Sequence, residues 1–278
     1  MFGPLRIKRS DHERIILVPD QWSGTVQQFY HFLLGYLAPL SLWIERTGRR
    51  RVTVRDCGPM NRWWSLLESE VDIEIVSPGD ALHIMAGRRQ RCVVLRGMDF
   101  PDSFDGPLIR RFANSMADRA GVQVRDRVAA EPRTTVVDRA ITDPFYLSPA
   151  SEIDASGRIR RSVPNLDEAV ADLPLARRPT IVELTDLTPD AQIRLLCETD
   201  LLIGQHGAGL TGMIWMPPGS MVIEIRPPLP EEVRGLFPLL AHSLGIQHRT
   251  IEQCDVHAPV DPAAIRAAMG AAVIEGSD

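Results

Sequence analysis

Short apolar runs alternate with segments of helical periodicity along most of the chain. The run at 15–18 is followed by apolar residues spaced three and four apart from Val26 to Ile44, which predicts a strand and then a helix that ends at Gly48. The same patterns predict strands at 52–54, 73–76, 92–95, 180–184, 201–203, 221–225 and 246–250. They predict helices at 63–67, 107–120, 189–198, after Gly209, at 231–243 and from Pro262. This alternation indicates an α/β fold with parallel sheets and helical crossovers.

The pattern loosens between residues 125 and 165 into Arg- and Asp-rich sequence with Pro, Ser and Gly, which indicates a domain junction. A length of 278 residues also suits two domains. We therefore expect two Rossmann-like domains, at residues 1–135 and 136–278, that face each other across a cleft. That cleft is the default ligand site. The last helix, at 261–274, could pack back toward the N-terminal domain.

The basic residues are almost all arginine. Lys8 is the only lysine, so arginine accounts for 30 of the 31 basic residues. This excludes a P-loop, which needs a lysine in its glycine-rich turn, and a pyridoxal phosphate enzyme, which needs one for its Schiff base. The net charge of -5 argues against nucleic acid as the main partner. The four cysteines are far apart and form no C-x-x-C pair, so we expect free thiols and no structural zinc.

The sequence shows no membrane span. No apolar run approaches the roughly 18 residues that a span needs, and the first residues lack the apolar core of a signal peptide. We therefore expect a cytoplasmic protein. Trp63-Trp64 and the arginines at 49–51 could touch a membrane surface and allow peripheral association at its inner face. The oligomeric state is not indicated.

The segment 200–211 offers the clearest candidate chemistry. A buried strand runs into a turn with Gly204, Gly207 and Gly209 that opens a short helix. Such a turn points free N–H groups and the positive end of a helix dipole at an anion. The glycine spacing differs from the G-x-G-x-x-G dinucleotide fingerprint, and a plain tight connection is an equal alternative.

Several segments together resemble one known family. Residues 204–211, with 218–220 and 222–225 downstream, are similar to the signature of family 61 glycosyltransferases, which include plant xylosyltransferases and a protein O-GlcNAc transferase. Residues 29–40 are similar to the family's N-terminal His-Phe helix. Looser matches are Arg160-Arg161 before Asn165, and the segment 240–245. The matches follow the family's order from about residue 29 to 250.

The resemblance implies a GT-B architecture, with the acceptor on the N-terminal domain and the nucleotide sugar on the C-terminal one. It also implies inversion at the anomeric carbon without a required metal or other cofactor. Consistent with that, the sequence has no strict Asp-x-Asp motif. A UDP-sugar is the expected donor, and a glycan, glycolipid or growing polysaccharide is the expected acceptor.

Three positions depart from the family pattern. Gly35 stands where the family has an acidic residue. Ser148-Pro149 stands where a Ser-Arg pair ends a strand, and the segment 164–168 displaces an Asn-Glu pair. The missing arginine puts part of the donor-phosphate site in doubt.

An inverting transfer needs positive potential for the departing nucleoside diphosphate. We expect this from the backbone N–H groups of Gly207, Ala208 and Gly209 and from Arg160 or Arg161. Glu224, at a strand end, could accept from ribose hydroxyls or could bind a neighbouring backbone group or arginine. The candidate donor-binding residues are Arg160, Arg161, His206, Gly207, Ala208, Gly209, Leu210, Thr211 and Glu224.

The transfer also needs a base for the acceptor hydroxyl. His31 is the first candidate because histidine titrates near neutral pH, although it could instead brace the helix as a core residue. Asp20, just past the first strand, is the reserve candidate. Asp99, Asp102 and Asp105 are expected to form a solvated acidic loop, although this loop could also meet acceptor hydroxyls.

Two alternative functions remain. A nucleotide-sugar epimerase on the same scaffold would use the phosphate site without a separate acceptor. A non-catalytic nucleotide-sugar or glycan-binding protein would explain the missing Ser-Arg arginine and Gly35.

Overall fold

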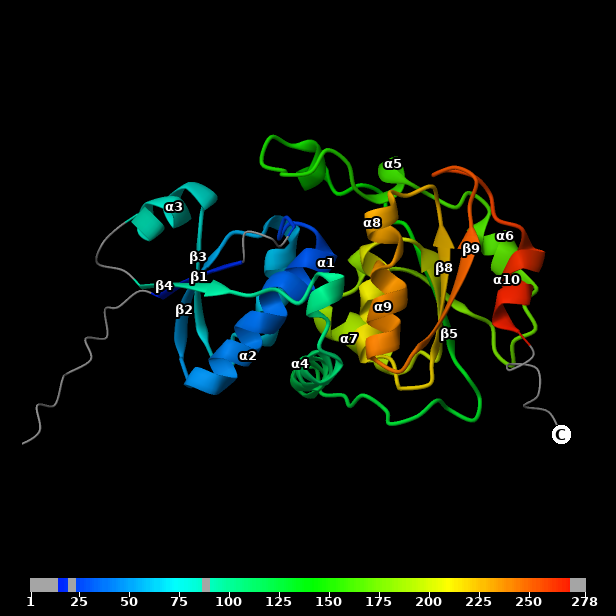
Figure 1. The fold of residues 1–278 in the computed structure, drawn as a ribbon, viewed down its shortest axis with the longest axis horizontal. Coiled ribbons are helices and arrows are strands. Elements are labelled where there is room, and N and C mark those ends of the chain that lie inside the picture. Colours follow the sequence, from blue (N-terminus) through cyan, green and yellow to red (C-terminus); the bar gives the residue numbers. More distant parts are fainter. Residues whose placement is uncertain (1–14, 20–23, 87–90, 271–278) are drawn as a thin grey trace, which may run out of the picture.

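A computed structural model describes residues 15–19, 24–86 and 91–270, and within these ranges the chain forms two parallel β-sheets (Figure 1). The first sheet has the order β3-β2-β1-β4, from strands β1 (Ile15–Pro19), β2 (Arg51–Arg55), β3 (Asp72–Val76) and β4 (Arg91–Leu95). The second has the order β6-β5-β7-β8-β9, from β5 (Thr134–Asp138), β6 (Thr180–Glu183), β7 (Leu201–Gln205), β8 (Met221–Arg226) and β9 (Gln247–Glu252). All neighbouring strands pair in parallel, so the expected α/β class is confirmed.

Helices connect the strands. In the first part of the chain they are α1 (Phe29–Phe32), the π-helical turn η1 (Leu33–Leu37), α2 (Ala38–Thr47), the 3₁₀ helix η2 (Gly58–Leu66), α3 (Pro78–Ala86), the 3₁₀ turn η3 (Pro101–Ser103) and α4 (Gly106–Arg119). Farther along they are the 3₁₀ turn η4 (Pro144–Leu147), α5 (Gly157–Arg160), α6 (Leu166–Ala171), the 3₁₀ turn η5 (Leu184–Asp186), α7 (Pro189–Cys197), the 3₁₀ helix η6 (Ala208–Trp215), α8 (Glu231–Arg234), α9 (Leu236–Ser243) and α10 (Pro262–Met269). The first helical stretch ends at Gly48 in the left-handed conformation, at φ 64°, as its sequence predicts.

The strands present alternate residues to two different layers, as the strand period of two requires. In β1, Leu17 faces the helices that lie between the two sheets, whereas Ile16 packs with α3 on the outer face. In β7, Leu202 likewise faces the central helices, and Ile203 joins the outer layer with α6 and α10. The molecule therefore has a helical layer between its two sheets and a thinner helical cover outside each sheet (Figure 1).

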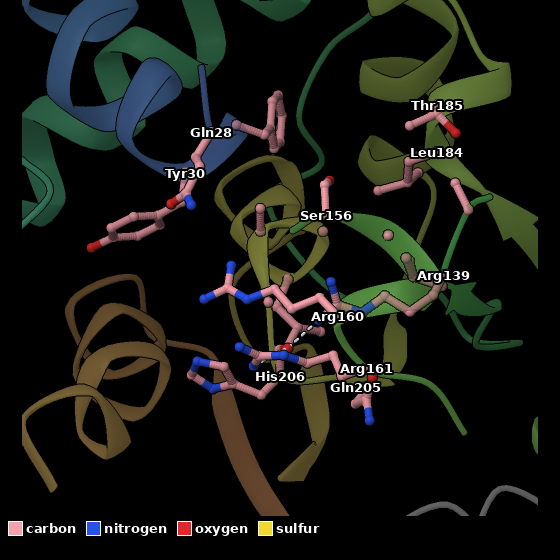
Figure 2. A pocket seen from close by; sticks show the side chains of 18 of the residues that line it. Gln28, Tyr30, Arg139, Ser156, Arg160, Arg161, Leu184, Thr185, Gln205 and His206 are labelled. Atoms are coloured by element: carbon pink, nitrogen blue, oxygen red, sulfur yellow. Dashed lines mark hydrogen bonds between the residues drawn. The ribbon is translucent and has the colours of Figure 1, made fainter. Parts of the chain in front are cut away.

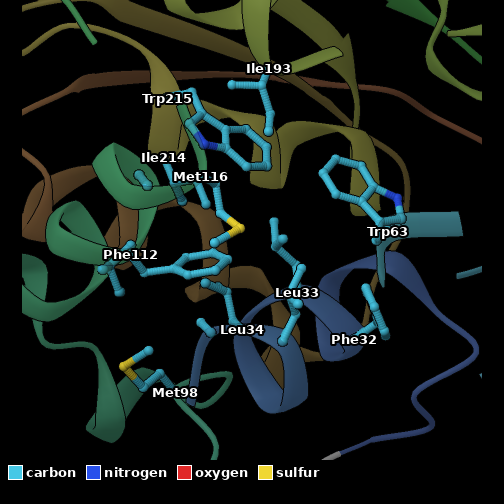
Figure 3. Packing of buried hydrophobic residues seen from close by; sticks show 14 of the residues in the cluster. Phe32, Leu33, Leu34, Trp63, Met98, Phe112, Met116, Ile193, Ile214 and Trp215 are labelled. Atoms are coloured by element: carbon cyan, nitrogen blue, oxygen red, sulfur yellow. The ribbon is translucent and has the colours of Figure 1, made fainter. Parts of the chain in front are cut away.

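The central helical layer is one continuous apolar core that both halves of the chain share (Figure 3). At its middle the indole rings of Trp63 and Trp215 stack with centroids 5.9 Å apart and planes only 9° apart. Trp63 and Trp64 are fully buried there, so the expectation that they could touch a membrane is wrong. In the described ranges no helix has the length and apolar character needed to cross a bilayer.

Polar contacts also join the two halves. Arg110 of α4 donates from its guanidinium to the carbonyl oxygens of Ile214, Met216 and Leu244, at 2.6 to 2.9 Å. These carbonyls end η6 and α9, where no further helical turn would satisfy them.

Two expectations about the second half are corrected. The last helix, α10, packs against α6 and the strands β8 and β9 of the second sheet rather than toward the N-terminal half. The loosened stretch 125–165 also contains a central strand, β5, which pairs with both β6 and β7. A domain division at residue 135 stays a prediction, and that residue lies inside β5.

Candidate active site

A cavity of about 660 Å³ lies between the two halves of the chain. Its walls come from α1 and η2 of the first half, and from the carboxyl ends of β5 and β7 with the segment 229–237 of the second half. Ligands of parallel α/β proteins gather beyond the carboxyl ends of strands, so this position fits a substrate site.

The glycine-rich turn after β7 forms one wall. Gly207 adopts φ 156° and ψ -179°, and a side chain there would overlap the guanidinium of Arg139. A Cβ on Gly209 would lie 2.9 Å from Val137 Cγ1. Within the described ranges, the N–H groups of Gly207, Ala208 and Gly209 have no acceptor, since they precede the first hydrogen bond of η6. The turn thus leaves donors free at the cavity, as the sequence predicts.

Three arginines converge beside this turn (Figure 2). Arg139 and Arg161 both donate to the carbonyl oxygen of His206, Arg161 at 3.1 Å, and Arg160 lines the same cavity. Across the described part of the chain, none of the three forms an ion pair with a carboxylate. They therefore form a concentrated positive charge, which the nearby carboxylate of Asp138 offsets only in part, since Asp138 pairs with Arg158.

The surroundings of Arg139 and Arg161 disfavour the charged form of each side chain. Burial, and then repulsion by Arg161 and Arg160, lowers the pKa of Arg139 to about 9. Burial and Arg160 lower the pKa of Arg161 to about 10. A bound anion would relieve both effects, because it would supply the missing opposite charge to a partly dehydrated site.

The sequence pattern aligns Ser148-Pro149 with the strand-ending Ser-Arg pair and does not identify Arg139. The structure corrects this: Ser148 follows the short turn η4, whereas strand β5 ends at Asp138, and Arg139 follows it directly in the cavity wall. An arginine thus does stand at a strand end beside the glycine turn. The short apolar run at 134–137, directly before Asp138-Arg139, is the signal that could have revealed it.

His206 follows β7 and lies against the edge of Phe237, with ring centroids 5.0 Å apart. Its Nδ1 contacts the carboxylate of Glu224. Burial lowers the pKa of His206, the contact with Glu224 opposes this, and Arg161 and Arg139 lower the pKa further. The imidazole is therefore neutral at pH 7, with its Nδ1–H directed at Glu224.

Glu224 does not face the cavity. It is fully buried, and its second oxygen lies 3.0 Å from Arg226 Nη2 and 3.0 Å from His248 Nε2. Burial raises the pKa of Glu224, but the contacts from His206, His248 and Arg226 outweigh this and hold the pKa well below its ordinary range. Of the two alternatives for Glu224, the structure agrees with the contact to a neighbouring arginine, because the buried carboxylate binds Arg226 and His206 and does not line the cavity.

Two other candidates in the glycine block differ from each other. Leu210 lines the cavity, whereas Thr211 is fully buried behind it. Thr211 therefore does not line this cavity.

His31 lies on α1, in the part of the cavity wall that the first half of the chain contributes. It lines the cavity, its side chain is 25% exposed, and its Nδ1 lies 2.7 Å from Asp99 Oδ2. The expected acidic loop is corrected accordingly: Asp99 is buried, Asp105 accepts from the Leu108 N–H and begins α4, and Asp102 is exposed. The reserve base, Asp20, lies outside the described residues.

Among the described residues, no group of three or more His, Cys, Asp and Glu side chains is arranged to hold a metal ion.

The fold and the cavity define an α/β protein whose two halves enclose a cavity lined by three arginines, a glycine-rich turn and His31. The family model for glycosyltransferase 61 matches residues 29–223. The chain belongs to this family, and the resemblance seen in its sequence is confirmed. The matched region includes His31, Arg139 and the glycine-rich turn.

A similar curated protein is the EGF domain-specific O-linked N-acetylglucosamine transferase of Drosophila melanogaster. It is 33% identical over 103 residues, which cover 36% of this chain and 19% of that protein. The chain thus matches less than a fifth of the relative's length.

Proposed function

We propose that this protein is an inverting, metal-independent glycosyltransferase of GT-B-like architecture, which transfers a sugar from a UDP-sugar to a glycan, glycolipid or polysaccharide acceptor. The observation that carries the proposal is the cluster of Arg139, Arg160 and Arg161 beside the glycine-rich turn, in one cavity with His31. Cytoplasmic location and peripheral membrane association stay predictions.

On the donor side, the arginines and the free N–H groups of Gly207, Ala208 and Gly209 bind the diphosphate. Their positive potential stabilises the negative charge that grows on the leaving oxygen as the bond from sugar carbon to phosphate oxygen breaks. Guanidinium groups suit this because they donate two parallel hydrogen bonds to phosphate oxygens. The only lysine of the chain, Lys8, is not needed.

On the acceptor side, His31 is the base. The acceptor oxygen attacks the anomeric carbon from the face opposite the diphosphate, and its proton passes to the imidazole. The nucleoside diphosphate leaves with the bonding electron pair, so the configuration at the anomeric carbon inverts. A neutral imidazole is the side chain best suited to take a proton near pH 7.

The relative's name supplies the first donor to test, because that protein transfers N-acetylglucosamine. Its EGF-domain acceptor is not carried over to this chain.

The test is release of UDP from UDP-N-acetylglucosamine and other UDP-sugars, with and without a panel of glycan acceptors. We expect acceptor-dependent release, a product of inverted anomeric configuration by NMR, and activity that survives EDTA. Retained configuration would contradict inversion, and loss with EDTA that Mg²⁺ or Mn²⁺ restores would contradict metal independence.

Variants assign the roles. His31→Gln should lower turnover about 10²- to 10⁴-fold while UDP affinity stays within about twofold. Arg139→Gln should weaken UDP binding, whereas Arg178→Gln, at an exposed site, removes the same charge as a matched control.

A changed sugar without any acceptor would show an epimerase instead. UDP binding by calorimetry without turnover of any donor would show a non-catalytic binder.

A further inference from the structure

We infer that Asp99 is the positioning residue for the base: its carboxylate holds His31 in the tautomer that carries hydrogen on Nδ1, and so leaves Nε2 free to take the acceptor's proton. The inference rests on the proposed function and deepens it. Asp99 stands 68 positions from His31 and was expected in a solvated loop.

The contact between the two side chains decides the tautomer. His31 Nδ1 lies 2.7 Å from Asp99 Oδ2. A carboxylate only accepts hydrogen bonds, so the hydrogen must lie on Nδ1. The N–H of Gly24 also points at Nδ1, but at 3.3 Å. Only one hydrogen can lie between Nδ1 and its partner, and the shorter, charge-assisted contact with Asp99 is the stronger one.

The backbone fixes Asp99 in this place. Tyr30, the neighbour of His31, donates from its hydroxyl to the carbonyl oxygen of Asp99 at 2.7 Å. The N–H of Met98 donates to the carbonyl oxygen of Leu34 at 2.9 Å. The segment that carries Asp99 is thereby tied to the helical stretch that carries His31, on both sides of the pair.

Two glycines make room for the pair. A Cβ on Gly35, one helical turn after His31, would lie 2.8 Å from Asp99 Oδ2 and 2.9 Å from its Cγ, closer than such atoms approach. A Cβ on Gly24 would overlap the imidazole ring. The departure from the family at position 35 thus has a structural counterpart: the space beside that backbone holds the Asp99 carboxylate.

The burial of Asp99 places its carboxylate where it can act on His31 without meeting the substrate. The side chain of Asp99 has no exposed surface, whereas that of His31 is 25% exposed and lines the cavity. The carboxylate therefore lies behind the imidazole, away from the substrate. It also stabilises the positive imidazolium that forms when His31 takes the proton, as a buried carboxylate does for the histidine of hydrolytic triads.

The test substitutes Asp99→Asn, which keeps the size of the side chain but can place an N–H opposite Nδ1. Asp102→Asn is the matched control, since it makes the same change at an exposed position three residues away. In ¹⁵N NMR spectra of histidine-labelled protein, assigned with His31→Gln, we expect hydrogen on Nδ1 in the wild type and on Nε2 in Asp99→Asn.

In UDP-N-acetylglucosamine turnover, we expect Asp99→Asn to lower kcat by about 10²- to 10⁴-fold with little change in KM or in UDP affinity. The double variant with His31→Gln should be no slower than His31→Gln alone, because the two residues act as one unit. Hydrogen on Nε2 in the wild type would overturn the inference, and so would wild-type kcat in a folded Asp99→Asn variant.

The two proposals fail in different ways. Absence of turnover with every donor would refute the proposed function, while the wild-type spectrum would still decide whether Asp99 sets the tautomer. Full activity in Asp99→Asn together with loss in His31→Gln would refute the role of Asp99 alone. Should Asp99→Asn not fold, the wild-type spectrum gives the same decision.

Discussion

Replacing Arg139 with glutamine should leave the free protein at least as stable as the wild type while it sharply weakens UDP binding. In the free protein the guanidinium of Arg139 is held close to Arg161 and Arg160 without an ion-pair partner in the described chain. Burial and this repulsion lower its pKa from 12.5 to about 9. Since one pKa unit corresponds to about 1.4 kcal/mol, the charge costs the free protein roughly 5 kcal/mol as an upper bound.

The substitution also has a cost. Arg139 donates to the carbonyl oxygen of His206, and a hydrogen bond from a charged donor contributes about 1.5 to 3 kcal/mol. The difference between the two effects is at most about 2 to 3.5 kcal/mol in favour of Arg139→Gln. The unfolded arginine is fully protonated at pH 7 and so is the folded one, so the whole penalty is present at that pH.

Thermal unfolding with and without UDP measures both sides of this balance. We expect the melting temperature of free Arg139→Gln to equal or exceed that of the wild type, by up to several degrees. Saturating UDP should then raise the melting temperature of the wild type well above that of the variant. Arg178→Gln should behave like the wild type in both conditions.

One result would refute this expectation. Free Arg139→Gln would melt below the free wild type by as many degrees as UDP-bound Arg139→Gln melts below the UDP-bound wild type. Arg139 would then be a structural residue whose bond to His206 outweighs its electrostatic cost, and the arginine cluster would not be a strained anion site.

Three further substitutions test other parts of the structure. Gly207→Ala should weaken UDP binding more than about tenfold by calorimetry, because the methyl group displaces the guanidinium of Arg139. Gly245→Ala is the control: Gly245 has a left-handed φ of 66° and open space around it, so the substitution should lower the free energy of unfolding by only about 1 kcal/mol. Glu224→Gln should lower the free energy of unfolding by about 3 kcal/mol in urea titrations at pH 7, because it leaves the largely buried guanidinium of Arg226 without a full opposite charge. The depressed pKa of Glu224 makes this difference complete above the ordinary carboxyl pKa of about 4.3 and smaller as the pH falls below it; a constant difference would contradict the assignment. In the same titrations, Arg110→Met should lower the free energy of unfolding by about 2 to 4 kcal/mol, because three hydrogen bonds to carbonyl groups are lost. The control Arg111→Met breaks one exposed ion pair and should lower it by less than about 1 kcal/mol. Equal effects would show that Arg110 does not hold the two halves together.

The sequence predicts the strands that carry long apolar runs and the helices with clear caps. Strand β7 and the glycine-rich turn after it were found because a fully buried strand must read as a continuous apolar run. Strand β5 was missed because only the short run at 134–137 lies between polar and proline-containing stretches, and the stretch was taken for a junction. Helix α10 was found, but its packing partner was not, because an apolar face does not say which surface it meets.

The candidate site shows the same limit. His31, Arg160, Arg161 and the glycine turn could be identified because each belongs to a local motif. Asp99 and the true place of Glu224 could not, because both depend on contacts between residues far apart in the chain. The carboxylate of Asp99 becomes a partner of His31 only when the loop after β4 is tied to the first helical stretch.

The shared core has a consequence for how the site works. His31 belongs to the helical stretch that packs on the first sheet, whereas Arg139 follows strand β5 of the second sheet and Arg160 and Arg161 lie at the end of α5. In the proposed mechanism, the packing between the halves therefore sets the position of the base relative to the diphosphate. That packing includes the stack of Trp63 on Trp215 and the three bonds from Arg110. A close-packed core is not compressible enough to let these groups drift by an ångström at small cost. We therefore expect the geometry of the proposed in-line attack to be present before the donor binds, which would leave the binding energy of the diphosphate available for stabilising the transition state.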